Sequence, residues 1–62
     1  MDAFEVLLQT IDDAVQSKRE WLASGQAPDY TEYKRICGEI HGLLFARQEA
    51  LDLKQKMENF DG

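Results

Sequence analysis

The chain has 62 residues, with twelve acidic residues against seven basic ones and a formal net charge of −5. A chain of this size buries only about 60% of the surface that its unfolded form exposes. It therefore needs a disulfide, a metal, self-association or a partner to be firmly stable. The acidic balance argues against a nucleic-acid grip through phosphate neutralisation, so we expect no direct contact with nucleic acid.

The residues that could carry chemistry are few and poorly placed for it. Cys37 is the only cysteine and His41 the only histidine, which excludes an internal disulfide and a zinc site. Glu39 lies two residues from His41 and faces another side of a helix, so the two cannot share a metal or a proton. Ser24 and Thr31 lack a histidine base held by a third group. We expect no enzyme activity, no catalytic residue, no metal and no cofactor, and we expect association with a protein partner or with itself.

The first helix is predicted over about residues 2–23. Asp2 to Glu5 form a capping box, in which the Asp2 side chain accepts from the Glu5 backbone and Glu5 reaches back, with Met1 and Val6 as the accompanying hydrophobic staple. A seam in steps of four and three follows, broken only by its lysine: Phe4, Leu8, Ile11, Val15, Lys18 and Leu22. Further apolar residues widen the seam on one side: Leu7, Ala14 and Trp21.

A loop is predicted over residues 24–29, because Gly25 follows the last apolar residue and Pro28 is the only proline. A second capping box, Asp29 to Glu32, starts a second helix over about residues 30–58, which overhangs the first by about two turns. The pattern is lost from Asn59 onward, where we expect fraying unless Phe60 finds a pocket. The predicted fold is all-α, a single antiparallel two-helix hairpin over residues 1–62, packed in an oligomer or on a larger partner.

The second helix carries apolar residues on two sides. Its core-facing seam holds ten positions: Tyr33, Ile36, Cys37, Ile40, Leu43, Leu44, Arg47, Ala50, Leu51 and Lys54. On roughly the opposite side three small residues follow one another at intervals of four, flanked by Phe45, Glu49 and Leu53: Gly38, Gly42 and Ala46. Five charged residues interrupt any membrane span, so we expect no contact with a membrane: Arg35, Glu39, Arg47, Glu49 and Asp52.

Each glycine inside a helix costs about 1 kcal/mol of helix stability relative to alanine. A helix that keeps two glycines on one side is therefore expected to use them for a contact. The small residues would form a shallow groove for another backbone or a bulky side chain. The alternative is that the glycines are tolerated on a side that faces solvent. The candidate partner-binding residues are Gly38, Gly42, Phe45, Ala46, Leu53 and Trp21. Trp21 either anchors an interface or packs over the end of the hairpin.

The loop and the front half of the second helix also carry a resemblance. Leu22–Gly25, Tyr30 and Tyr33–Leu43 combine small loop residues, a tyrosine followed by a basic residue, and two glycines four residues apart. This combination resembles a family of short, mostly uncharacterised proteins encoded by tailed bacteriophages. The resemblance implies a phage origin and a structural role as a minor virion or head-assembly component.

The alternative function is a small acidic adaptor or inhibitor that binds a host or phage enzyme. The opening residues lack a basic region followed by an apolar core and a cleavage site. We therefore expect the chain in the host cytoplasm, where it would be made, and in the structural reading also in the virion.

Overall fold

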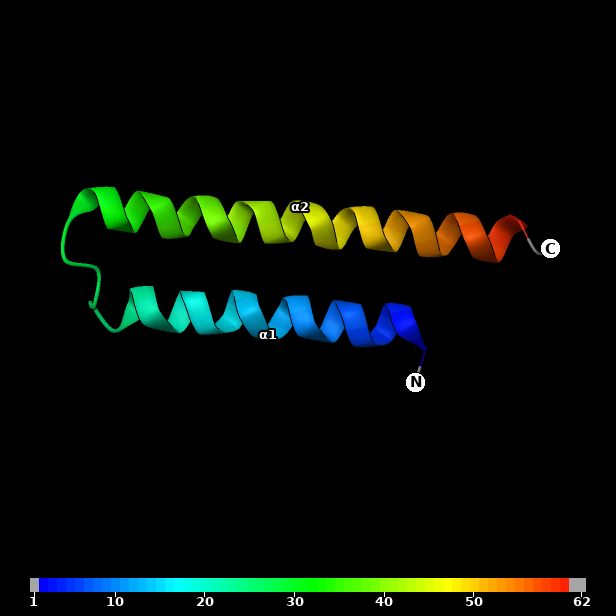
Figure 1. The fold of residues 1–62 in the computed structure, drawn as a ribbon, viewed down its shortest axis with the longest axis horizontal. Helices are drawn as coiled ribbons and strands as arrows, with labels where there is room; N and C mark the ends of the chain where they lie inside the picture. The colour runs from blue at the N-terminus through cyan, green and yellow to red at the C-terminus, as the bar shows by residue number, and fades with distance from the viewer. Residues whose placement is uncertain (1, 61–62) are drawn as a thin grey trace.

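Two antiparallel helices joined by a short loop make up the computed structural model, which describes residues 2–60 (Figure 1). Helix α1 spans Ala3–Ala23 and helix α2 spans Tyr30–Phe60, and these residues contain no strand. The predicted all-α hairpin is confirmed. Helix α2 continues past the N-terminus of α1 and remains helical to Phe60, so the fraying expected from Asn59 is not found there. Asp61 and Gly62 lie outside the described residues.

Each helix begins at an aspartate that caps its first turn. Oδ1 of Asp2 accepts from the backbone N–H of Glu5 at 2.8 Å, and Oδ1 of Asp29 accepts from that of Glu32 at 2.9 Å. These bonds satisfy N–H groups that have no partner inside the helix. Within residues 2–60 neither glutamate bonds back to its aspartate, so only half of each predicted box forms. Met1 of the predicted staple lies outside the described residues.

Helix α1 ends at a glycine in the left-handed conformation. The backbone N–H of Ser24 donates to Glu20 at 2.9 Å, and that of Gly25 donates to Leu22 at 3.1 Å. Gly25 has a φ of 78°, which a residue with a Cβ adopts only with strain. The chain therefore turns where the sequence predicts, and α2 starts six residues after Ser24, at Tyr30.

The core is one layer of side chains between the two helices. Ile11 and Val15 of α1 meet Ile36 and Ile40 of α2, and these four are 4–8% exposed. All four belong to the predicted seams. The molecule measures 51 × 20 × 11 Å, so it is a plate about one helix thick. No side chain among residues 2–60 is less than 2% exposed, which leaves the hairpin with a thin core.

Two ion pairs cross between the helices on either side of this core. Nζ of Lys18 lies 2.7 Å from Oε1 of Glu39, towards the loop. Nε of Arg47 lies 2.7 Å from Oδ1 of Asp12, towards the open end. Exposed ion pairs add little stability, but two of them at separate heights favour one register of α1 against α2.

Candidate protein-interaction surface

The apolar residues of α2 that face away from α1 form one exposed surface. We call it the outer face of α2, and it consists of Gly38, Gly42, Phe45, Ala46, Leu53, Met57 and Phe60. At about 100° per residue these positions fall within roughly one third of the helix circumference, opposite the core-facing seam. Phe45 is 69% exposed, Leu53 51% and Phe60 91%. Five of the six predicted partner-binding residues therefore lie together on one surface.

The two glycines leave the backbone of α2 bare in the middle of this face. A Cβ built on Gly38 or Gly42 would meet no atom within 4 Å. Neither glycine therefore serves the packing of α1 on α2, which takes place on the other side of the helix. No contact within the hairpin offsets their helix-propensity cost of about 1 kcal/mol each.

Trp21, the sixth predicted residue, is not part of the outer face. Its ring belongs to α1, is half-buried and packs against the core cluster near the end of the hairpin. It borders an open surface hollow of about 400 Å³ with Ser17, Lys18, Arg35 and Ile36. Trp21 therefore does not share a surface with the other five predicted partner-binding residues. Of its two interpretations, the contacts support packing over the end of the hairpin.

Sequence reasoning missed Met57 and Phe60, which extend the outer face towards the end of α2. Met57 is 52% exposed. The two residues follow Leu53 at intervals of four and three, which places them on the same side of a continuous helix. This spacing could have predicted both residues from the sequence, but only with the assumption that the helix continues to Phe60.

The opposite long edge of the hairpin is acidic. On α1 the positions that face away from α2 form what we call the acidic edge: Asp2, Glu5, Gln9, Asp13, Gln16 and Glu20. All six are exposed and none is basic, while Arg19 borders the edge beside Gln16. Gln9 donates to Asp13 at 2.8 Å and Gln16 to Glu20 at 3.1 Å. The two edges of the plate thus differ in chemistry, one apolar and one anionic.

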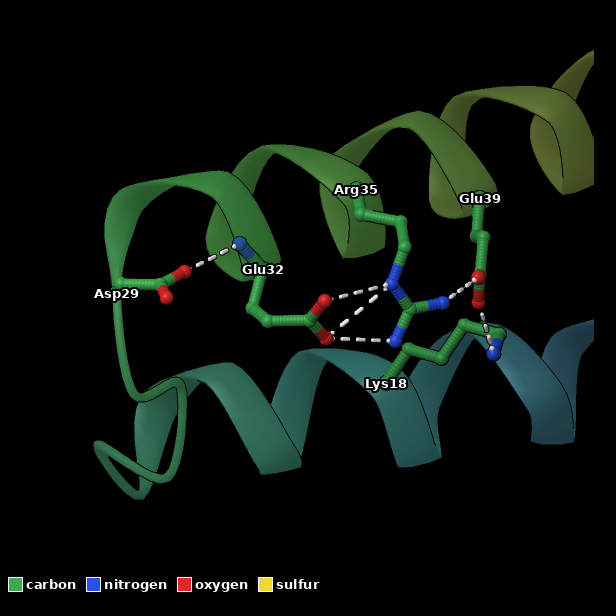
Figure 2. A network of polar contacts seen from close by, with 5 residues as sticks. All are labelled: Lys18, Asp29, Glu32, Arg35 and Glu39. Atoms are coloured by element: carbon green, nitrogen blue, oxygen red, sulfur yellow. Dashed lines mark hydrogen bonds and ion pairs between the residues drawn. The ribbon is translucent and has the colours of Figure 1, made fainter.

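A polar network near the loop joins the two helices (Figure 2). Arg35 binds Glu32, with Nη2 and Oε2 2.8 Å apart, and also binds Glu39, which in turn accepts from Lys18. The hydrogen bond from Lys18 lowers the pKa of Glu39 below its ordinary value of 4.5. A carboxylate held ionised by two cations is a poor general acid or base near neutral pH. The network therefore acts in structure and not in proton transfer.

The start of α2 carries aromatic contacts that the sequence interpretation did not predict. The rings of Tyr30 and Tyr33 stack with their centroids 6.3 Å apart, and Nζ of Lys34 lies 6.0 Å from the centre of the Tyr30 ring. Tyr30 is 72% exposed. Of these residues Lys34 borders the outer face of α2, whereas Tyr33 lies on the core-facing side of the helix.

Neither metal binding nor membrane crossing finds support in the part of the chain that the structure describes. Residues 2–60 contain no group of three or more histidine, cysteine, aspartate or glutamate side chains that could hold a metal ion. Over the same residues neither helix has a stretch long and apolar enough to cross a membrane.

Comparison with protein families, curated proteins and solved structures finds no match to this chain.

Proposed function

We propose that the protein is a non-enzymatic interaction module that packs the outer face of α2 against protein. The observation that supports this is the exposure of Phe45, Leu53 and Phe60 on one side of one helix, around two bare glycines. Apolar side chains exposed together on one side of a small domain, with a charged residue such as Glu49 among them, mark a site of protein interaction. Docking would also compensate for the thin core of the hairpin.

In the setting that the sequence resemblance implies, the module is a structural component of a tailed phage. Hairpins would dock by the outer face of α2 on a larger ring or shell, as a minor virion or head-assembly protein. A plate about one helix thick suits this role, because it adds to an assembled surface without a large volume of its own. The protein would be made in the host cytoplasm and carried into the virion.

Mass spectrometry of virions purified from the phage that encodes the chain tests this role. We expect the protein at a fixed ratio to the major head protein. Phe45→Glu should abolish its incorporation, because it places a charge in the middle of the outer face. Gln9→Glu makes the same change of charge on the acidic edge and should leave incorporation intact. Purified virions that lack the wild-type protein would refute the structural role.

The acidic edge of α1 favours a second candidate function, an adaptor or inhibitor that binds a basic site on a host or phage enzyme. Affinity capture from infected cells with the wild-type chain and with Asp13→Lys separates the two candidates. A partner lost with Asp13→Lys but kept with Phe45→Glu supports the adaptor. The reverse result supports docking through the outer face of α2.

A further inference from the structure

We propose that the outer face of α2 binds a second copy of this chain, with the two α2 helices antiparallel about a two-fold axis between His41 and Gly42. The inference rests on the proposed function, since it names the partner of the same surface. In such a pair each residue of one copy faces the residue of the other copy that is equally far from the axis on its other side. The same helix must therefore supply both partners of every contact. The outer face meets this requirement in shape and in charge.

The shape requirement is met by Gly38 and Phe45, which are equally far from the axis. Phe45 projects from the face with 69% of its surface exposed, and the space over Gly38 is open, with no atom within 4 Å of a Cβ built there. The ring of one copy therefore fits over the bare backbone of the other, and the symmetry makes this contact twice. Small residues spaced by four allow the helix axes to come close enough for it.

The charge requirement is met by Glu49 and Lys34, which are also equally far from the two-fold axis along the helix. Among residues 2–60 neither takes part in an ion pair, although both are exposed on or beside the outer face. In the antiparallel pair Glu49 faces Lys34 of the second copy. In a parallel pair in register Glu49 would meet Glu49 and Lys34 would meet Lys34. Like charges at these positions disfavour the parallel pair.

The same arrangement keeps the acidic edges apart. Both α1 helices lie on the outside of the pair, where their carboxylates face solvent. Association through α1 would instead bring together two acidic edges, and none of the six positions of an edge is basic. The distribution of charge over the hairpin thus selects α2 as the central element of the dimer.

The exposed apolar side chains also supply much of the area that a small interface needs. Phe45 is 69% exposed and Leu53 51%, and Tyr30, which is level with Leu53 of the second copy, is 72% exposed. With aromatic rings of about 150–250 Å² each, these side chains present roughly 700 Å² over two copies. Specific interfaces begin at about 1,000–1,200 Å² of total buried surface. The face can therefore form a small but specific interface once the surrounding backbone and polar rim are added.

Sedimentation velocity of the full chain at micromolar concentration tests the pair. We expect a dimer for the wild type and at least about a tenfold weaker association for Glu49→Lys, which would place two lysines opposite each other. Adding Lys34→Glu to Glu49→Lys should restore the dimer. Asp13→Lys is the matched control, with the same change of charge on the acidic edge, and should remain dimeric. Circular dichroism on each sample establishes that the helices are intact.

The register is tested by cross-linking in a chain whose own thiol is removed by Cys37→Ser. His41→Cys places a thiol next to the axis, so oxidation should link two copies rapidly. Leu53→Cys places its two thiols about 35 Å apart in the antiparallel pair and should not link them. Efficient linkage through both positions would indicate a parallel pair and overturn the proposal.

A wild-type chain that stays monomeric at these concentrations would also overturn the dimer. The proposed function fails separately, because incorporation into virions and capture of a different protein are measured in other experiments. A monomer that still requires Phe45 to enter virions would retain the interaction module and refute only the second copy as its partner.

Discussion

Lys18 shows how a charged residue can occupy an apolar seam without a buried charge. Its Nζ lies 2.7 Å from Glu39 of the other helix, and its side chain is 32% exposed. The carbon stem of a lysine can cover apolar surface while the ammonium group leaves at the side. Arg47 does the same on the seam of α2 by reaching Asp12. The charged residues that interrupt the two apolar seams therefore form ion pairs between the helices.

The Lys18–Glu39 pair predicts a dependence of stability on pH. Hydrogen bonding to Lys18 holds the pKa of Glu39 in the folded chain below 4.5. A group with a lowered pKa stabilises the fold above its ordinary pKa, and this contribution is lost as pH falls through the lowered value. We expect the urea concentration at the midpoint of unfolding to decrease as the pH is lowered from about 5 to about 3.

An NMR titration of the Glu39 carboxyl group checks the cause. Lys18→Met should raise the pKa of Glu39 and weaken the acid dependence of the denaturation midpoint. Lys56→Met removes a lysine that makes no ion pair within residues 2–60 and should change neither quantity. A Glu39 titration that stays the same in Lys18→Met would exclude Lys18 as the source of the shift.

The glycines of the outer face predict effects of opposite sign on the single chain and on its assembly. Replacing Gly38 and Gly42 with alanine meets no atom within 4 Å, so helix propensity alone should stabilise the hairpin by up to about 2 kcal/mol. In a close contact with a partner the added groups intrude, and overpacking costs about 1–3 kcal/mol. Gly42→Leu should therefore raise helicity and reduce association. Circular dichroism and oligomer mass on the same sample measure both effects. Raised helicity with unchanged mass and unchanged partner binding would show that the glycines face solvent and line no contact.

At the scale of the helices, hydrophobic spacing and capping residues were enough to predict most of the fold. The seams around Ile11 and Ile36, the turn at Gly25 and the start of α2 after Asp29 all follow from local rules of backbone geometry and burial. These rules depend only on neighbours within about two turns of a helix. This is why they could be read without the tertiary structure.

The remaining features depend on competition between partners that spacing cannot rank. Glu32 can bond back to its cap or bind Arg35, and the second arrangement is found because Arg35 also bridges to Glu39. Trp21 lies at the margin of the seam of α1, and only the placement of α2 decides that it packs on the core. Phe60 joins the outer face of α2 only because the helix extends two residues beyond its predicted end.

The cap of α2 gives a prediction at this scale. Asp29→Ala removes the acceptor of the Glu32 N–H and should destabilise the hairpin by about 1 kcal/mol. Asp29→Asn keeps an acceptor and should be close to neutral. Asp13→Ala removes an exposed aspartate from the middle of α1 and controls for the loss of charge. Urea unfolding followed by circular dichroism measures all three, and equal midpoints for Asp29→Ala and Asp13→Ala would show that the cap contributes nothing.

At the scale of the whole molecule, the thin plate has one anionic edge and one apolar edge. A single layer of core side chains limits what the isolated hairpin can gain by folding. The anionic edge of α1 is exposed to solvent, which charged groups favour, while the outer face of α2 still has apolar area to bury. Folding and association should therefore be coupled through α2.

This coupling predicts that the melting temperature of the wild-type chain rises with protein concentration. Anything that binds only the folded state stabilises it by mass action. For a dimer above its dissociation constant, each tenfold increase in concentration adds about 0.7 kcal/mol per chain, which corresponds to roughly 3–5 °C for a chain of this size. Thermal unfolding over a hundredfold range of concentration, followed by circular dichroism, measures the shift. Glu49→Lys should melt at a temperature that does not depend on concentration and should coincide with the wild type at high dilution, because Glu49 makes no ion pair within residues 2–60. A wild-type melting temperature that stays constant over the whole range would show that the hairpin folds on its own and that its apolar edge is reserved for a different protein.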